Sequence, residues 1–257
     1  MKKIKHITVI GDGGWGTTLA IHLVKKGFSV TLWGPFEAYI QEMRKSRFND
    51  KFLPSIKLPL QLKLTADLTQ ALNNADLIVF AIPSQYTSST LRKLKPFNLR
   101  GKIFLSVTKG IEDKTLLRIS EIIKRELGNI PLAVLSGPTI AREVALGIPS
   151  TAVIASRNLQ TAKILQNVFN SETFRIYTNT DMIGVELGGS VKNVIALACG
   201  ICDGLKFGTN TKAAILTRGL AEMARLGKAL GANEKTFSGL TGLGDLATTC
   251  FSPQSRN

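Results

Sequence analysis

Residues 7–17 read ITVIGDGGWGT, a short β-branched run that breaks into the pattern Gly-x-Gly-x-x-Gly. A helical pattern follows at once, from Thr17 to Lys26, and a second strand-like run covers Ser29 to Trp33. A strand, a glycine-rich turn, a helix and a second strand in this order predict a βαβ unit. In that context the glycine pattern predicts a dinucleotide-binding site.

Each glycine of the pattern has its own structural use. Gly11 permits the tight turn after the strand, Gly13 lets the backbone approach a pyrophosphate, and Gly16 lets the helix pack closely on the strand. The free amide groups and the dipole of a helix N-terminus favour a bound anion at this point.

The end of the second strand leaves the choice of cofactor open. It reads Trp33-Gly34-Pro35, without an acidic residue for a ribose 2′-hydroxyl and without an arginine for a 2′-phosphate. The predicted cofactor is therefore NAD or NADP, with Glu37 and Arg44 as the nearest candidates for this contact.

Strand-like and helix-like runs continue to alternate up to residue 177. Leu77–Ile82 is apolar throughout, as expected for a parallel strand that is covered on both faces. Further helices are expected at 37–47, 67–73, 84–95, 114–127, 140–146 and 159–169, and further strands at 102–107, 132–135, 150–155 and 174–177. Repeated βα units of this kind predict an α/β fold with a doubly wound, mostly parallel sheet and right-handed crossovers.

The pattern changes to helices alone from Thr180 onward. Asp181–Asp203 is predicted to be one long helix that starts at a Thr-Asp cap, Thr180-Asp181, and ends at Gly204. A second helix is expected to begin at Asn210 or Thr211. We therefore expect two domains, a dinucleotide-binding domain at residues 1–179 and a helical substrate domain at residues 180–257.

The composition of the 257 residues limits the class of protein. With 44% hydrophobic and 20% charged residues the chain is predicted to be globular. An excess of 33 Lys and Arg over 18 Asp and Glu, a net charge of +15, favours anionic ligands. The basic residues are spread along the chain without interleaved aromatic residues, so nucleic acid is not an expected partner.

Cysteine usage and the apolar runs suggest a cytoplasmic protein. The three cysteines, an odd number, favour a reducing compartment over a disulfide framework. Cys199 and Cys202 form a Cys-x-x-Cys pair inside an apolar helical run, so we expect core packing and no metal site. The apolar run before Gly11 is too short for a signal peptide, and no segment approaches the length of a membrane span.

Several polar residues stand where they could take part in catalysis, after predicted strands or within a predicted helix. Lys109 directly follows an apolar strand, so it is expected to project into the crevice that holds the dinucleotide. Lys192 lies in the middle of a long helix, and three of its four neighbours one turn away are small, so a ligand can approach it closely. Burial beside another cation such as Lys109 would lower the pKa of Lys192 and suit it to carry a proton.

The glycine-rich segment 239–245 could present Asp245 to Lys192, and Arg256 is suited to bind phosphate.

Six motifs stand in the order found in NAD(P)-dependent glycerol-3-phosphate dehydrogenases. They read GDGGWGT at 11–17, VTKG at 107–110, LSGP at 135–138, VKN at 191–193, GLGD at 242–245 and SRN at 255–257. The chain resembles the bacterial form of this family from the first strand to the last residue. The resemblance implies a Rossmann-like fold and the interconversion of dihydroxyacetone phosphate and sn-glycerol 3-phosphate, a phosphorylated small molecule that supplies the backbone of phospholipids.

The resemblance also implies roles for individual residues. Lys192 would be the proton carrier, and Lys109 would touch both nicotinamide and substrate. The implied cofactor contacts are Gly11, Gly13, Gly14, Trp15, Gly16, Lys109, Ala141 and Arg256. The implied substrate contacts are Lys109, Gly137, Thr139, Lys192, Asp245, Ser255, Arg256 and Asn257.

The helical domain of the family continues beyond the Ser-Arg-Asn motif and adds cofactor contacts. A chain that stops there is expected to leave an apolar surface exposed or covered by a second subunit, as in a homodimer. We expect it to bind NAD(P)H through its N-terminal domain and to turn over slowly until the remaining helices are added.

Two other functions stay open at this point. One is a related 3-hydroxyacid or 6-phosphogluconate dehydrogenase, which uses a similar Lys-Asn helix but is disfavoured by Trp15 and the terminal Ser-Arg-Asn. The other is a protein that binds a nucleotide without turnover. The sequence leaves feedback inhibition and the physiological direction undecided.

Overall fold

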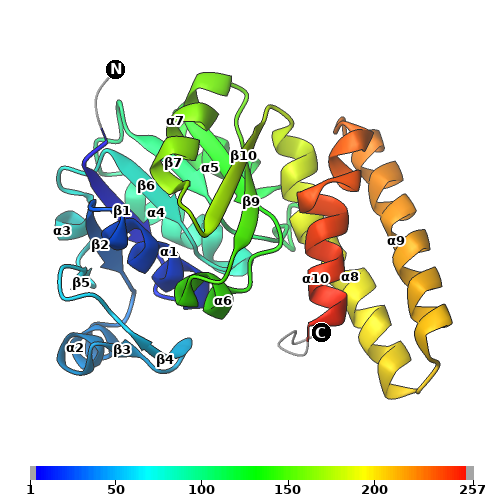
Figure 1. Cartoon of the computed structure of the whole chain (residues 1–257). Helices are drawn as coiled ribbons and strands as arrows, with labels where there is room; N and C mark the ends of the chain where they lie inside the picture. Colours follow the sequence, from blue (N-terminus) through cyan, green and yellow to red (C-terminus); the bar gives the residue numbers. More distant parts are fainter. Residues whose placement is uncertain (1–3, 253–257) are drawn as a thin grey trace.

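The computed structural model describes residues 4–252 and centres on an eight-stranded sheet (Figure 1). The strand order is β10-β9-β8-β7-β6-β1-β2-β5. The strands of this sheet are β1 (His6–Ile10), β2 (Ser29–Trp33), β5 (Lys63–Thr65), β6 (Leu77–Phe80), β7 (Ile103–Ser106), β8 (Leu132–Ser136), β9 (Ser150–Ala155) and β10 (Phe174–Asn179). Neighbouring strands are parallel except β8 and β9, which are antiparallel, so the prediction of a doubly wound, mostly parallel sheet is confirmed.

The helices follow the predicted alternation with shifts at their ends. They are α1 (Gly14–Lys25), α2 (Glu37–Ser46), α3 (Leu68–Leu72), α4 (Thr87–Leu94), α5 (Ile119–Leu127), α6 (Ala141–Leu146), α7 (Leu159–Phe169), α8 (Met182–Gly204), α9 (Thr209–Ala229) and α10 (Asp245–Phe251). The expected helix start at Lys114 was wrong, because Leu116 has a positive φ of 56° and Arg118 caps α5 together with Glu121. The small antiparallel pair β3 (Phe48–Asn49) and β4 (Leu53–Lys57) and the edge strand β5 were not predicted.

The sheet has an apolar core on each face. Alternate residues of β6 enter different cores, since Leu77 and Val79 pack with α1 and α7, whereas Ile78 and Phe80 pack with α4 and α5. This arrangement explains why the run at 77–82 is apolar throughout, because both faces of the strand are buried.

The helical part lies beside the β8–β10 end of the sheet, where α8, α9 and α10 pack together (Figure 1). Asp181 caps α8 by accepting a hydrogen bond of 2.9 Å from the amide of Gly184. Cys199 and Cys202 are buried, as expected. Cys250 packs with Cys199 in the core of this bundle, and burial raises the pKa of its thiol to about 12. Four apolar side chains, three on α8 and one on the residue that caps its end, are more than half exposed: Val194, Leu197, Ile201 and Leu205.

Helix α8 is also long and apolar enough to cross a membrane, with a mean hydropathy of 1.4 over its best window. The core helix of a globular protein passes the same test, and α8 contains two buried charged residues, Glu186 and Lys192. Charged side chains are costly in a bilayer, so this helix is weak evidence for a membrane segment.

Glu186 fixes the start of α8 against α5. Its carboxylate accepts hydrogen bonds from the backbone amide of Ser120 at 2.8 Å and from its hydroxyl at 2.6 Å, and it pairs with Arg118 at 2.7 Å. Burial raises the pKa of Glu186, and these partners oppose the shift.

We expect Glu186→Ala to lower the free energy of unfolding by about 3–5 kcal/mol, because it leaves the half-buried Arg118 without its buried partner. Urea denaturation followed by circular dichroism measures the change. A loss below about 1 kcal/mol would show that α8 is held by apolar packing alone.

Candidate functional site

The glycine-rich loop turns from β1 into α1 at the carboxyl edge of the sheet. Gly11 has a φ of +119°, and a Cβ there would lie 2.5 Å from the carbonyl oxygen of Ala81. A Cβ on Gly16 would collide with the carbonyl oxygen of Gly11, so the helix and strand pack as closely as the pattern requires. Gly13, in contrast, faces open space, with no heavy atom within 4 Å of its would-be Cβ. The N-terminus of α1 is thus open where a pyrophosphate would bind.

Three further predicted cofactor residues lie around this loop. Gly14 and Trp15 form the first turn of α1, and the Trp15 ring meets Phe174 edge-to-face at 6.3 Å. Ala141 starts α6, and its carbonyl oxygen accepts a hydrogen bond of 3.0 Å from the hydroxyl of Thr18 on α1. These contacts place Ala141 beside the loop although 123 residues separate it from Thr18.

Asn49 is a residue of this loop region that the sequence did not reveal. Its fully buried side chain donates hydrogen bonds of 2.8 Å to the backbone oxygen of Asp12 and 2.7 Å to the hydroxyl of Thr17. The Tyr39 hydroxyl donates a hydrogen bond of 2.6 Å to the side-chain oxygen Oδ1 of Asn49. Asn49 therefore holds the glycine loop in place, and only its tertiary contacts identify it.

Two lysines and one aspartate meet two strands away from the loop. Lys109 follows β7, Lys192 lies in the middle of α8, and Asp245 begins α10. The Asp245 carboxylate lies between the two ammonium groups, 2.5 Å from Nζ of Lys109 and 2.8 Å from Nζ of Lys192. Lys109 also donates to the carbonyl oxygen of Gly137 at 3.1 Å. Because β1, β7 and β8 are parallel, this charge cluster and the glycine loop share one edge of the sheet, about 10 Å apart at the usual strand spacing.

Two adjacent glycines of α8 make this meeting possible. A Cβ on Gly188 would collide with the carbonyl oxygen of Thr241, and one on Gly189 would lie 2.5 Å from the hydroxyl of Ser136 and 3.4 Å from Cγ of Lys109. The small residues beside Lys192 therefore admit the segment before α10 on one side and Lys109 on the other.

The surroundings of Lys192 favour its neutral form. Lys192 is 7% exposed, and burial lowers its pKa; the charge of Lys109 lowers it further, while Asp245 opposes the shift. A lysine whose pKa is lowered gives up its proton more readily than an exposed lysine, which suits it to general acid–base catalysis. Buried lysines whose pKa is shifted by a nearby charge are typical of active sites.

A cavity of about 110 Å³ opens onto this cluster. Its lining consists of Lys109, Thr139, Ile140, Lys192, Asp245, Thr248, Thr249 and Ser252. Thr249 was not predicted: its hydroxyl accepts a hydrogen bond from Lys192 and donates one of 2.7 Å to the backbone oxygen of Asp245. Its position one helical turn after Asp245 is the signal that could have identified it.

Ser190 is a second residue that the sequence did not reveal. Its hydroxyl accepts a hydrogen bond of 3.0 Å from the amide of Gly110 and donates to the backbone oxygen of Glu186 at 2.7 Å. It thereby ties the loop that contains Lys109 to α8.

Comparison with known proteins gives the family. Residues 6–162 match the model of the NAD-dependent glycerol-3-phosphate dehydrogenase N-terminus, and residues 181–257 match the model of its C-terminus. The chain belongs to this family. It is an oxidoreductase that uses NAD or NADP.

The relatives of this dehydrogenase are similar over nearly all of its residues. It is 48% identical to the glycerol-3-phosphate dehydrogenase [NAD(P)+] of Prosthecochloris aestuarii, over 98% of this chain and 76% of that protein. It is 46% identical to the Bacillus subtilis protein of the same name, over 99% of this chain and 74% of that protein. The crystal structure of glycerol-3-phosphate dehydrogenase from Coxiella burnetii superimposes with a TM-score of 0.95 at 42% identity, covering 98% of this chain and 78% of that chain.

Five of the predicted residues remain to be placed. Ser255, Arg256 and Asn257 lie outside the described residues. Arg44, a candidate for ribose contact, donates hydrogen bonds of 3.0 and 2.7 Å to the backbone oxygen of Leu64, and Glu37 lies 3.5 Å from Arg44. The Arg44 side chain therefore faces the edge strand β5, and Glu37 lies beside it.

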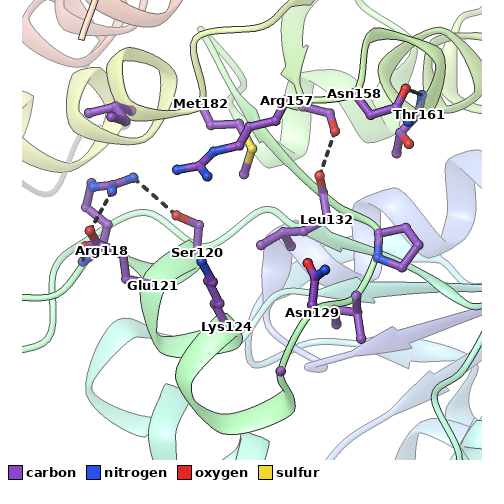
Figure 2. A pocket seen from close by; sticks show the side chains of 15 residues that line it. Arg118, Ser120, Glu121, Lys124, Asn129, Leu132, Arg157, Asn158, Thr161 and Met182 are labelled. Carbon is purple, nitrogen blue, oxygen red and sulfur yellow. Dashed lines mark hydrogen bonds and ion pairs between the residues drawn. The ribbon is translucent and has the colours of Figure 1, made fainter. Parts of the chain in front are cut away.

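The dehydrogenase also has a larger cavity of about 620 Å³, between α5, the turn before α7 and the start of α8 (Figure 2). Its polar residues include Arg118 and Ser120, which are already bonded to Glu186. None of the predicted site residues within the described range 4–252 lines this cavity. We assign the chemistry to the smaller cavity, where buried charges converge.

Proposed function

We propose that the protein interconverts dihydroxyacetone phosphate and sn-glycerol 3-phosphate, with Lys192 as the proton carrier. The observation that carries this proposal is the buried Lys109–Asp245–Lys192 cluster, on the same sheet edge as the open glycine loop. A bound nicotinamide supplies hydride to the substrate carbonyl carbon in the reducing direction and accepts it in the other.

The residues of the cluster have complementary tasks. Protonated Lys192 donates a proton to the carbonyl oxygen during reduction, and neutral Lys192 takes it back during oxidation. Asp245 holds both ammonium groups in place, so Lys192 has one orientation toward the cavity. Lys109 adds positive charge that favours an anionic substrate. Gly137 and Thr139 would line the substrate site, and Ser255, Arg256 and Asn257 would hold its hydroxyl and phosphate groups.

We further propose that residues 1–179 bind the dinucleotide and residues 180–257 complete the substrate site. The end of β10 at Asn179 and the start of α8 at Met182 support this division. Buried free cysteines support a cytoplasmic location, and a role in supplying glycerol 3-phosphate for phospholipids follows from the reaction. A homodimer would cover the exposed apolar residues of α8.

Substrate selection tests the proposed function. We expect oxidation of NADH or NADPH, followed at 340 nm, with dihydroxyacetone phosphate and at least about a hundredfold lower kcat/KM with unphosphorylated dihydroxyacetone, because charged phosphate contacts are lost. Equal rates of NADH oxidation with a 3-oxoacid, the oxidised partner of a 3-hydroxyacid, would support the related dehydrogenases instead. Binding of NADH without any turnover would support a non-catalytic protein.

The lowered pKa of Lys192 predicts opposite pH profiles for the two directions. Reduction needs the protonated amine, so its kcat/KM falls as pH rises through the Lys192 pKa, which lies below the ordinary lysine value. Oxidation needs the neutral amine, so its kcat/KM rises over the same range. Initial rates in both directions between pH 6 and 10.5 measure this; parallel profiles would contradict the role of Lys192.

A further inference from the structure

Asp12, the second residue of the glycine loop, has a buried carboxylate that the proposed reaction does not use. The residue is 7% exposed, and its Oδ2 atom has no hydrogen-bond partner among the described residues. Burial raises the pKa of Asp12, and a hydrogen bond from its own backbone and the charge of Lys51 oppose the shift. A buried carboxylate oxygen without a donor is costly, so a ligand that brings a hydroxyl donor to Oδ2 gains a strong hydrogen bond.

The carboxylate of Asp12 lies at the end of β2. A Cβ on Gly34 would collide with Oδ2 and would lie 2.5 Å from Cγ of Asp12. Gly34 directly follows Trp33, the last residue of β2, and its amide donates to the backbone oxygen of Thr65 at 3.1 Å. Asn49 fixes the backbone of Asp12 by its hydrogen bond of 2.8 Å. The glycine at position 34 thus makes room for a carboxylate that comes from the neighbouring loop.

The end of β2 is the place where a dinucleotide-binding fold distinguishes NAD from NADP. An acidic residue there accepts a hydrogen bond from the ribose 2′-hydroxyl, whereas an arginine accommodates a 2′-phosphate. In this chain Gly34, Pro35 and Phe36 follow β2, so neither group comes from the usual position. Arg44 is engaged at Leu64, and the exposed Lys51 lies over the ring of Phe52 at 5.2 Å.

We propose that Asp12 takes the place of the missing acidic residue and makes the enzyme select NADH over NADPH. This inference rests on the dinucleotide site proposed above. The carboxylate accepts a hydrogen bond from the adenosine ribose of NADH, and its negative charge repels the 2′-phosphate of NADPH. Selectivity therefore resides in the glycine loop, and Gly34 is the residue that permits it.

Fluorescence titration with NADH and with NADPH tests the proposal without any need for turnover. We expect the unmodified chain to bind NADH more tightly than NADPH, and Asp12→Ala to reduce the ratio of the two affinities by about tenfold or more. Asp12→Asn keeps the shape and removes the charge, so it should weaken discrimination against NADPH in the same direction. The exposed Asp50 gives a control of equal charge, and Asp50→Asn should leave the ratio unchanged.

Three outcomes would overturn the proposal: an unmodified chain that binds NADPH as tightly as NADH, an affinity ratio unchanged in both Asp12 variants, or an equal change in Asp50→Asn. Circular dichroism confirms that each variant is folded before titration. A failure of the proposed reaction itself would be distinct, because it would abolish turnover while leaving the ratio of the two affinities measurable.

Discussion

Lys192→Ala is expected to lower kcat for dihydroxyacetone phosphate reduction by roughly 10²–10⁴-fold, the usual contribution of general acid–base catalysis. The side chain is buried and bonded to Asp245 and Thr249, so no solvent-exposed lysine can replace it at the cavity. Affinity for NADH should change little, because the glycine loop follows β1, whereas Lys192 lies near Lys109 at the end of β7. Steady-state rates and NADH fluorescence titration measure the two effects separately.

A matched control for this variant is Lys228→Ala, since Lys228 is an exposed lysine of α9 that does not line the cavity. We expect it to retain full activity. A Lys192→Ala protein that kept half of the original kcat would exclude Lys192 as the proton carrier. A large loss of NADH affinity would instead indicate a collapsed site.

Gly13→Val is expected to reduce NADH affinity by at least about a hundredfold, or about 2.8 kcal/mol, while the chain remains folded. The φ of −64° and ψ of 171° at Gly13 suit any residue, and its would-be Cβ meets no atom within 4 Å. The valine side chain would therefore occupy only the space that we assign to the pyrophosphate. Unchanged NADH fluorescence titration would place the cofactor elsewhere.

Gly16→Val separates this effect from a structural one. A side chain there would collide with the Gly11 carbonyl oxygen, and its Cβ would lie 3.1 Å from Cβ of Ala81, which follows β6. We therefore expect a much lower Tm for this variant. If Gly13→Val were equally destabilised, its loss of affinity would say nothing about the pyrophosphate. The pair thus distinguishes a binding glycine from a packing glycine.

The elements that could be predicted from the sequence are those whose signal lies within a few consecutive residues. The loop at 11–16, the double-sided strand at 77–82 and the Asp181 cap were readable because glycine spacing, apolar continuity and capping act over a few residues. The antiparallel direction of β9 was not readable, since its composition suits either direction. Strand β5, only three residues long at the sheet edge, gives too little periodicity to be seen.

The site residues divide in the same way. Lys192 stood out because a lysine interrupts an apolar helix, and the small residues at 188 and 189 indicated close approach. Asn49 and Ser190 carry no such signal, because common polar residues gain their roles from partners distant in the chain. In the sequence, Asp12 occupies a variable position of the glycine pattern, which assigns it no role. Gly34 was noted only because no acidic residue stands at the end of the second strand.

Hydride transfer between nicotinamide and dihydroxyacetone phosphate is the central claim, and isotope labelling tests it most directly. The chain is incubated with dihydroxyacetone phosphate and NADH that carries deuterium at both C4 positions, and the product is analysed by mass spectrometry. An end-point reading of this kind also detects slow turnover. The account predicts sn-glycerol 3-phosphate with one deuterium at C2, strongly reduced in Lys192→Ala. Product without deuterium, or none after many hours with a chain shown to bind NADH, would contradict it.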